Sequence, residues 1–345
     1  MSYLNLFGLK VRHGRYRLTV RILITGGFGF VGGRLAEHLA EGGHQIVLGT
    51  RNSISSCDWL PFADVTQTVW DDDLALERSC NGIDVVIQAA GMNAQDCTFD
   101  PVAALAFNGV ATSRLVEAAS RAGVKRFIYL STAHVYASPL VGTITEETCP
   151  RNLHPYATSH LAGEYAVLSA NQSGKIKGTV LRLSNVFGVP VHKEVNCWML
   201  LVNDLCQQAI KTRKLVLQTS GEQQRDFISM AEICHVIEYF ISDNHAVTHS
   251  IIFNVGSGLS QSVLAMAQTI QQRCVELLSF RPELKSGLKR GVGEELSLLN
   301  YKTNNLDVLG VKLNGSDNAL EVDKLLLFCQ SVFSQTNNPI ASVKN

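Results

Sequence analysis

The amino-acid sequence predicts an α/β fold in which helices cover both faces of a parallel sheet. Short apolar runs recur along the first 255 residues and alternate with longer segments of helical periodicity. These runs lack the alternating polar residues of a half-exposed strand, which indicates strands buried on both faces. A glycine-rich turn joins the first run to the first helical segment. Alternation of this kind is typical of a doubly wound parallel sheet.

The strands and helices are expected in a regular order. The runs interpreted as strands are residues 20–24, 45–48, 84–88, 125–130, 179–183 and 251–255. The segments interpreted as helices are residues 34–40, 101–122, 156–171, 198–210 and 229–241. Helix 101–122 has a proline at its first position, which suits the first turn of a helix, and a glycine directly after its end.

Composition argues against several classes of protein. The 345 residues are 46% hydrophobic and 17% charged, which is enough apolar material for a sizeable core. The formal net charge of +0 argues against nucleic acid or an anionic membrane as a partner. The nine cysteines contain no C-x-x-C pair, so we expect no metal site and the reduced thiols of a cytoplasmic protein. No apolar run approaches the roughly 20 residues of a membrane span.

The glycine-rich turn after the first strand is the most informative stretch of the chain. Gly26 suits a tight turn, Gly29 lets the backbone approach a pyrophosphate, and Gly32 lets the helix pack close to the strand. The helix that follows offers the N–H groups of its first residues, Phe30 and Val31, together with the positive end of its dipole. Strand, turn and helix in this order predict a dinucleotide site of the Rossmann type, against the alternative of an ordinary glycine-rich turn.

The regularity of the pattern sets the expected domain organisation. The alternation of strands and helices is lost between residues 189 and 226 and again after residue 255. We therefore predict an NAD(P)-binding core at 18–188 plus 227–254, and a smaller C-terminal substrate-binding lobe at 189–226 plus 255–345. Residues 1–17 contain four Lys or Arg residues and are interpreted as a basic N-terminal arm.

Several motifs in a fixed order resemble those of extended short-chain dehydrogenases/reductases. The segments that carry the resemblance are residues 25–32, 89–91, 108, 131–136, 156–159, 182–188, 224–228 and 254–258. The most similar branch is the NAD-dependent epimerase/dehydratase family, which acts on nucleotide sugars. The resemblance implies a Rossmann doubly wound sheet, an NAD or NADP cofactor, a nucleotide-sugar substrate, and a homodimer that pairs helices 101–122 and 156–173.

The resemblance also implies roles for individual residues of the site. Tyr156 would be the catalytic acid/base that exchanges a proton with a sugar hydroxyl or ketone during hydride transfer. Thr132 would hydrogen-bond the reacting oxygen and so bind the substrate. Asn108 would hold a water in the proton path, or would be a purely structural buried asparagine. Ala89 and Ala90, which follow a predicted strand, would contact the cofactor.

The chain departs from the family pattern at one catalytic position. The family has Tyr-x-x-x-Lys, whereas this chain has His160 four residues after Tyr156, on the same face of a helix. The family lysine binds the nicotinamide ribose and lowers the tyrosine pKa. A histidine can hydrogen-bond the ribose but carries a full charge only when protonated, with a reference pKa of ~6.5. Either His160 acts with help from the charge of the oxidised nicotinamide, or the site has lost redox activity. The other motifs favour the first interpretation.

Positions 133 and 134 bear on the type of reaction. In the 4,6-dehydratases of the family an Asp-Glu pair lies here and serves water elimination, whereas this chain has Ala133 and His134. The resemblance therefore disfavours dehydration and favours epimerisation or ketone reduction. His134 is either an additional proton donor or an ordinary histidine of the core or surface.

The choice between NAD and NADP depends on the end of the second strand. NAD-preferring members place Asp or Glu there to bind the ribose 2′-hydroxyl. This chain has no acid between residues 47 and 52, and Arg51 can pair with a 2′-phosphate. This favours NADP slightly, unless Arg51 is simply solvated. Asp71, or its neighbour Asp72, is expected near the adenine.

Two further matches concern the substrate. Arg225 corresponds to a family arginine that contacts the nucleotide diphosphate, and Asn185 to a substrate-binding asparagine, although a surface ion pair is the alternative for the arginine. The leading hypothesis is an NAD(P)-dependent epimerase or 4-keto reductase that acts on a nucleotide-activated sugar. The alternatives are a reductase of a non-sugar carbonyl and a redox-silent NAD(P)-binding sensor or scaffold protein.

Overall fold

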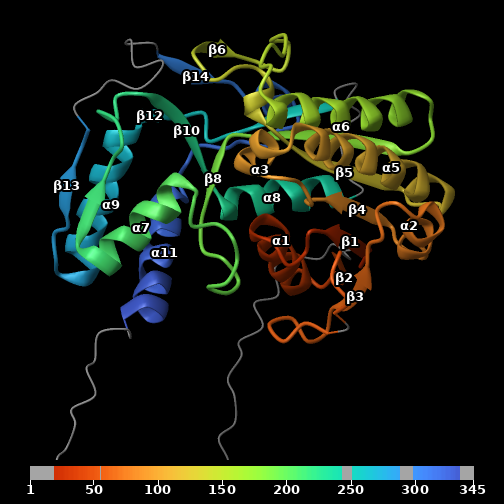
Figure 1. The fold of residues 1–345 in the computed structure, drawn as a ribbon, viewed down its shortest axis with the longest axis horizontal. Helices are drawn as coiled ribbons and strands as arrows, with labels where there is room; N and C mark the ends of the chain where they lie inside the picture. Colours follow the sequence, from red (N-terminus) through yellow and green to blue (C-terminus); the bar gives the residue numbers. More distant parts are fainter. Residues whose placement is uncertain (1–18, 55, 243–250, 288–297, 335–345) are drawn as a thin grey trace, which may run out of the picture.

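The computed structural model describes residues 19–54, 56–242, 251–287 and 298–334, so the predicted arm at 1–17 lies outside the described residues. Its centre is a seven-stranded parallel sheet with the strand order β11-β7-β5-β4-β1-β2-β3 (Figure 1). The strands are β1 (Arg21–Thr25), β2 (Gln45–Thr50), β3 (Asp64–Gln67), β4 (Val85–Gln88), β5 (Arg126–Thr132), β7 (Lys177–Leu183) and β11 (Ile252–Val255). The predicted doubly wound Rossmann sheet is confirmed.

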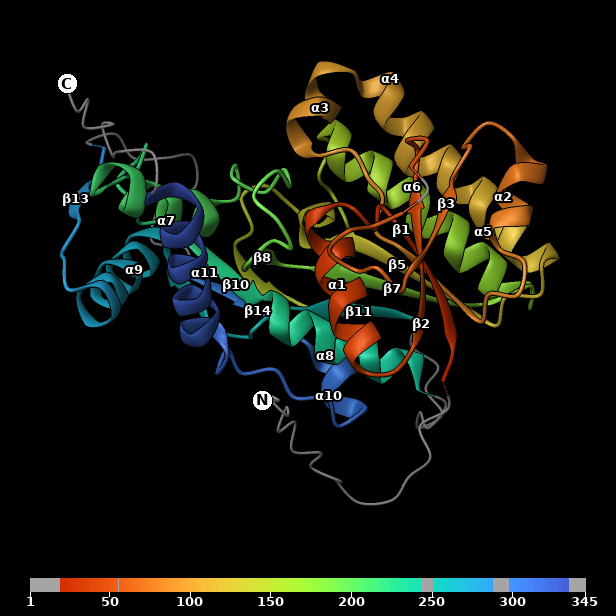
Figure 2. The same ribbon diagram turned by 90° about the horizontal axis from the view of Figure 1, so that it is seen from below.

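Helices cover both faces of this sheet. One face carries α1 (Phe30–Glu41) and α8 (Met230–Ile241), and the other carries α2 (Asp73–Ser79), α5 (Thr112–Arg121) and α6 (Pro155–Gln172). Figure 2 shows α8 and α6 on opposite sides of the sheet. Successive strand residues alternate between two apolar cores, so that Leu23 packs on one face and Ile24 on the other. This burial on both faces explains why the strands are continuous apolar runs in the sequence.

The predicted helix 101–122 is not a single α-helix, and this expectation is corrected by the structure. A π-helical segment, η1 (Leu105–Ala111), separates α4 (Pro101–Ala104) from α5. A methyl carbon placed on Gly109 would lie 3.0 Å from the Ala162 side chain, so η1 approaches α6 closely at this point. Apolar periodicity predicts the helix but does not reveal the wider turn. Segments of this kind are frequent at functional sites, and η1 contains Asn108.

The rest of the chain forms small sheets and helices beside the large sheet. The strands are β6 (Gly142–Ile144), β8 (Asn185–Phe187), β9 (Lys214–Val216), β10 (Gln224–Ser229), β12 (Ser260–Ser262), β13 (Glu283–Lys285) and β14 (Leu299–Tyr301). The helices α7 (Leu201–Thr212), α9 (Val263–Leu278) and α11 (Asn318–Phe333) pack around an apolar core of their own. Figure 1 shows these helices together at one end of the molecule.

One late segment returns to the large sheet. The helix α10 (Asn304–Val308) contributes Leu306 to the core beneath α8, although it belongs to the sequence range assigned to the substrate-binding lobe. The division into core and lobe therefore stays a prediction. The helix α7 begins three residues later than the predicted start at residue 198. Among the described residues, no helix has the length and apolar character needed to cross a membrane.

Candidate active site

The glycine-rich turn has the backbone geometry that a dinucleotide requires. Gly26 has a φ of +66°, and a methyl carbon placed on it would lie 2.9 Å from the backbone of Ala90, just after β4. A methyl carbon on Gly32 would collide with the carbonyl oxygen of Gly26. Gly29 is the N-cap of α1 and places no side chain over the helix end, where the first N–H groups lack intrahelical partners. The turn therefore fits a pyrophosphate group bound by backbone N–H groups.

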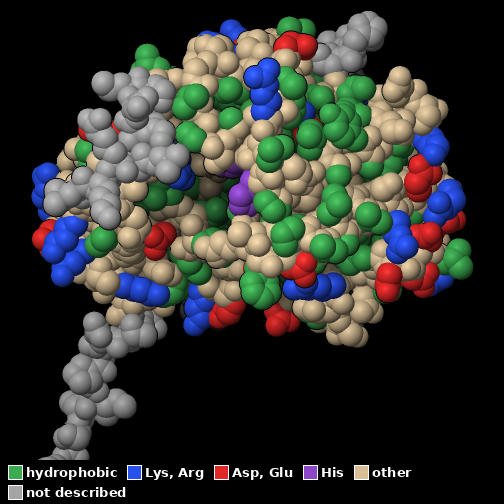
Figure 3. Space-filling model, turned by 45° about the horizontal axis from the view of Figure 1, so that its top comes forward, with side chains coloured by type: hydrophobic (Ala, Val, Ile, Leu, Met, Phe, Trp, Pro, Cys, Tyr) green, Lys and Arg blue, Asp and Glu red, His purple; other side chains and the backbone are tan. Residues whose placement is uncertain are grey.

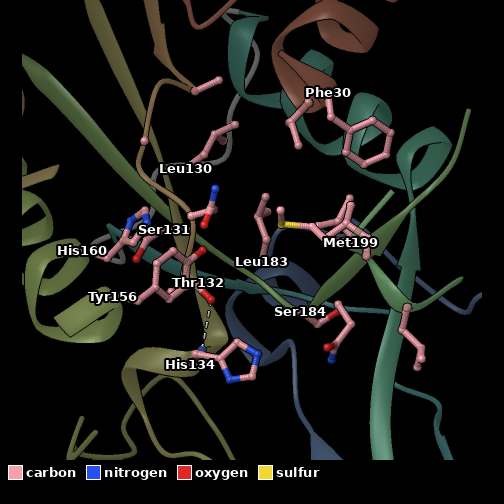
Figure 4. Close-up of a pocket in the computed structure, with 18 of the residues that line it drawn as sticks. Phe30, Leu130, Ser131, Thr132, His134, Tyr156, His160, Leu183, Ser184 and Met199 are labelled. Atoms are coloured by element: carbon pink, nitrogen blue, oxygen red, sulfur yellow. Dashed lines mark hydrogen bonds between the residues drawn. The ribbon is translucent and has the colours of Figure 1, made fainter. Parts of the chain in front are cut away.

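A cavity of about 440 Å³ lies beyond this turn, where β4, β5 and β7 end. Figure 3 shows a hollow in this face of the molecule with histidine at its wall, and Figure 4 shows the cavity itself. The residues predicted for the site that line it are Phe30, Val31, Ala89, Thr132, Tyr156, His160, Asn185 and Arg225. Parallel strands that end at one edge bring these separate segments together, as open α/β sheets do at their ligand sites.

Tyr156 and Thr132 meet on one wall of the cavity (Figure 4). Tyr156 is the second residue of α6, whose N-cap is His154. The Thr132 hydroxyl lies beside the Tyr156 phenol and accepts a 3.1 Å hydrogen bond from the backbone N–H of His134. Burial raises the pKa of Tyr156, and the nearby Thr132 hydroxyl acts in the opposite direction. The pair can therefore hold one substrate oxygen between two hydroxyl groups.

His160 lies one helical turn after Tyr156 and packs edge-to-face against it, with ring centroids 4.6 Å apart. Its Nδ1 is 3.0 Å from the hydroxyl of Tyr129, a buried residue of β5. Burial lowers the pKa of His160 to about 4. The imidazole is therefore neutral near pH 7, and it does not supply the positive charge of the lysine found in the family pattern.

Asn108 is fully engaged with protein groups. Its Oδ1 accepts a 2.9 Å hydrogen bond from the backbone N–H of Met92, and its Nδ2 donates a 3.0 Å hydrogen bond to the Ser159 hydroxyl. The side chain is 1% exposed and does not line the cavity. These contacts tie the segment after β4 to α6 and so favour the structural interpretation. Its role in holding a water stays a prediction.

Arg225 lies where the main cavity meets a second cavity of about 240 Å³, and His134 and Asn185 line both cavities with it. In the part of the chain that the structure describes, no carboxylate lies within ion-pairing distance of Arg225, and burial lowers its pKa. The Asn185 amide is fixed by a 2.9 Å hydrogen bond to the backbone carbonyl of Asp226. Burial, followed by the charge of Arg225, lowers the pKa of His134. An uncompensated guanidinium at this place is suited to an anionic ligand.

A third cavity of about 550 Å³ contains the residues predicted for the adenosine end of the cofactor. Arg51 and Asp71 both line it and are exposed, whereas Asp72 caps α2 through the backbone N–H of Ala75. Most residues that line this cavity were not predicted. Among them are Trp70 and Phe107, whose ring centroids are 5.2 Å apart, and Arg114, which donates a 3.3 Å hydrogen bond to the Trp70 carbonyl. In the sequence, the signal that could have pointed to this cavity is Trp70, a large aromatic residue soon after a strand.

A buried ion pair behind the site was also missed. Arg182 of β7 contacts Glu164 of α6, with Nη2 and Oε2 2.6 Å apart, and Ser131 donates a 2.5 Å hydrogen bond to the same carboxylate. The Arg182 guanidinium also lies 4.7 Å from the centre of the Tyr136 ring. Glu164 and Arg182 are 0% and 3% exposed, so they act on the site by fixing β7 and, through Ser131, β5 against α6. The sequence signal that could have pointed to this ion pair is the position of Glu164, which lies one helical turn after His160 on the same face of the helix.

The fold and this site define a dinucleotide-binding protein of the Rossmann type. Residues 22–256 match the model of a family described as the NAD dependent epimerase/dehydratase family. The chain therefore belongs to the NAD-dependent epimerase/dehydratase family.

Individual relatives in this family have different activities. The dTDP-D-glucose 4,6-dehydratase of Mus musculus is 27% identical over 266 residues, which are 73% of this chain and 72% of that protein. The dTDP-6-deoxy-L-talose 4-dehydrogenase (NAD(P)(+)) of Kitasatospora kifunensis is 29% identical over 263 residues, 72% of this chain and 78% of that protein. The UDP-glucose 4-epimerase of Thermus thermophilus, solved as a complex with NAD, superimposes with a TM-score of 0.73 at 20% identity, covering 90% of this chain and 99% of that one.

Proposed function

We propose that this chain is an NAD(P)-dependent epimerase or 4-keto reductase that acts on a nucleotide-activated sugar. The observation that carries the proposal is the pair of hydroxyl groups of Tyr156 and Thr132, side by side in a cavity that extends from α1 to the guanidinium of Arg225. One end of this cavity suits a dinucleotide, its middle suits a hydroxyl or keto group, and its far end suits a diphosphate. The named activities of the relatives support the same class of substrate.

The residues divide the chemistry between them. A nicotinamide group, when bound, supplies the acceptor or donor of hydride. The Tyr156 phenol takes the proton from the sugar hydroxyl or returns it to the ketone, and Thr132 holds the same oxygen in place. His160, as a neutral side chain on the cavity wall, donates a hydrogen bond to a ribose hydroxyl of the cofactor. Arg225 and Asn185 bind the diphosphate and orient the sugar.

The residues beside Thr132 argue against dehydration. Water elimination needs an acid and a base at the sugar, and the resemblance places them at positions 133 and 134. Ala133 is 1% exposed and has no ionisable group, and His134 is a single imidazole without a carboxylate at position 133. We therefore favour epimerisation or ketone reduction, although the mouse relative is a 4,6-dehydratase by name.

NMR of a nucleotide-sugar panel tests this proposal, because epimerisation leaves no net change in cofactor absorbance. We expect one UDP-, GDP-, CDP- or dTDP-sugar to be epimerised, or its 4-keto form to be reduced. Arg225→Ala should raise KM about tenfold, because one charge-assisted contact to phosphate is lost. Arg281→Ala, at an exposed arginine outside these cavities, is the control. A panel that stays unchanged would contradict the proposal, and a 4-keto-6-deoxy product would show dehydration instead.

Arg51 gives the cofactor preference a direct test. Because it lines the third cavity and no acid follows β2, we expect NADPH to bind about tenfold more tightly than NADH, a difference that one charge-assisted contact can supply. Arg51→Ala should remove this preference and leave the affinity for NADH unchanged, which makes NADH the internal control. Fluorescence titration measures both affinities. Tighter binding of NADH by the wild-type protein would contradict the preference.

A redox-silent NAD(P)-binding protein is the second candidate. The observation in its favour is the neutral His160, which leaves Tyr156 without the nearby cation that lowers the tyrosine pKa in the family pattern.

A homodimer also belongs to the proposal. Residues 101–122, one of the segments expected to pair, expose apolar side chains at Val102, Leu105 and Val110, as a subunit interface requires. A solution mass equal to one chain would contradict the dimer.

A further inference from the structure

A buried row of polar side chains leads from the first strand of the sheet to His160. Its members are Thr25 (β1), Gln88 (β4), Thr112 (α5), Tyr129 (β5) and His160 (α6). None of them is more than 7% exposed, so each must find its hydrogen-bond partners within the protein. The proposed function uses only the last member, which leaves the other four without a role.

The backbone of Ala90 fixes the direction of the first hydrogen bonds. Its carbonyl oxygen can only accept, and it lies 3.3 Å from Nε2 of Gln88, so the Gln88 side chain turns its NH₂ group to this side. The other end of that amide, Oε1, accepts a 2.8 Å hydrogen bond from the Thr25 hydroxyl. Thr25 in turn accepts from the Ala90 N–H at 3.4 Å, which leaves its own proton for Gln88.

The same direction continues to the histidine. Nε2 of Gln88 donates to the Thr112 hydroxyl oxygen at 3.4 Å, so the Thr112 proton is left to point toward the nearby Tyr129 phenol. Burial, followed by the charge of Glu164, raises the pKa of Tyr129 well above its usual value, so the phenol keeps its proton. The Tyr129 hydroxyl lies 3.0 Å from Nδ1 of His160 and 3.4 Å from the backbone carbonyl oxygen of the same residue, and the shorter distance favours donation of its proton to Nδ1. Thr25, Gln88 and Thr112 are thus joined by hydrogen bonds of one direction, and Tyr129 and His160 continue the row.

We propose that this row locks His160 in the tautomer that carries its proton on Nε2, and that Tyr129 is the residue that positions it. His160 and Gly91 both line the main cavity, and a methyl carbon placed on Gly91 would lie 3.8 Å from Nε2. The Nε2–H group is therefore a fixed, neutral donor on the cavity wall. Its assignment to a ribose hydroxyl of the cofactor rests on the proposed function, whereas the tautomer does not.

Gly163 provides the space that the row needs. A methyl carbon at Gly163 would lie 2.5 Å from the Tyr129 hydroxyl oxygen and 2.6 Å from the carbonyl oxygen of Asn108. No side chain can therefore stand between α6 and the Tyr129 hydroxyl at this position. The family pattern has the mobile ammonium group of a lysine at position 160. This chain has instead a rigid imidazole, and Tyr129 of the sheet sets its orientation.

Long-range ¹H–¹⁵N NMR of the full chain, labelled with ¹⁵N-histidine and free of cofactor, tests the tautomer directly. The His160 signal is assigned by its loss in His160→Gln. At neutral pH we expect a protonated Nε2 and an unprotonated Nδ1 in the wild-type protein. Tyr129→Phe, which removes one hydroxyl, should give a mixture of both tautomers and roughly fivefold weaker binding of NADPH, the effect of one neutral hydrogen bond. Tyr165→Phe, at an exposed tyrosine of the same helix, should change neither quantity.

Several outcomes would overturn the inference. A proton on Nδ1 in the wild-type protein would show that the row runs in the opposite direction. An unchanged tautomer in Tyr129→Phe would show that Tyr129 does not position the ring. If Tyr129→Phe does not fold, Thr112→Val removes the donor that sets the direction, and it should also give a mixture. A correct tautomer in a protein without turnover would refute the proposed function and support this inference.

Discussion

Tyr156→Phe is expected to lower kcat by roughly 100- to 10,000-fold, the usual contribution of a positioned acid or base, while the cofactor binds as in the wild-type protein. The substitution removes only the phenolic hydroxyl that lies beside Thr132 in the main cavity. The ring remains and can still pack edge-to-face against His160, so the wall of the cavity keeps its shape. The loss should therefore appear in the chemical step and not in binding.

Two measurements separate the possible results. The rate on the substrate found in the nucleotide-sugar panel gives kcat, and fluorescence titration with NADPH gives the affinity. Tyr165→Phe, at an exposed tyrosine of the same helix, controls for the loss of a phenol in general. A Tyr156→Phe enzyme with the wild-type rate would show that another group transfers the proton. A wild-type protein that is inert on every substrate, and that binds cofactor as its Tyr156→Phe variant does, would favour the redox-silent protein.

The parts of the structure that could be predicted depend on neighbours in the sequence. The turn at Gly26 is one example, because strand, glycine-rich turn and helix follow each other directly, and Gly29 and Gly32 both meet the carbonyl oxygen of Gly26. The buried strands are another, since burial on both faces leaves its mark as an apolar run. Tyr156 and Thr132 were predicted from the family resemblance, and both lie at the carboxyl edge of the parallel sheet, where open α/β sheets bind ligands.

The parts that could not be predicted depend on packing between distant segments. The π-helical turn around Asn108 lies where Gly109 approaches α6 closely, and apolar periodicity reveals neither feature. Trp70, Phe107 and Arg114 come from separate elements, and only the fold brings them to one cavity. The charge of His160 is a further case. The residue itself is visible in the sequence, but its neutrality is caused by burial, and burial is a property of the folded chain.

The neutrality of His160 predicts how stability depends on pH. In the unfolded chain a histidine has a pKa of ~6.5, whereas burial lowers that of His160 in the folded protein to about 4. Between these two values the unfolded state binds a proton that the folded state excludes, so the free energy of unfolding falls as the pH falls. Above the higher value neither state is protonated at this position, and below the lower value both are. The loss is therefore confined to the window between pH 6.5 and pH 4.

His160→Gln removes this proton and keeps a polar side chain at the position. Between pH 7 and pH 5 we expect the wild-type protein to lose about 2 kcal/mol more of its free energy of unfolding than the variant loses. Urea unfolding at each pH measures the difference. His134, whose pKa burial also lowers, is present in both proteins, so its contribution cancels in the comparison. Parallel pH profiles for the two proteins would show that His160 titrates normally when folded. The imidazole could then be charged near pH 6, and it would act as the cation that replaces the family lysine and not as a fixed neutral donor.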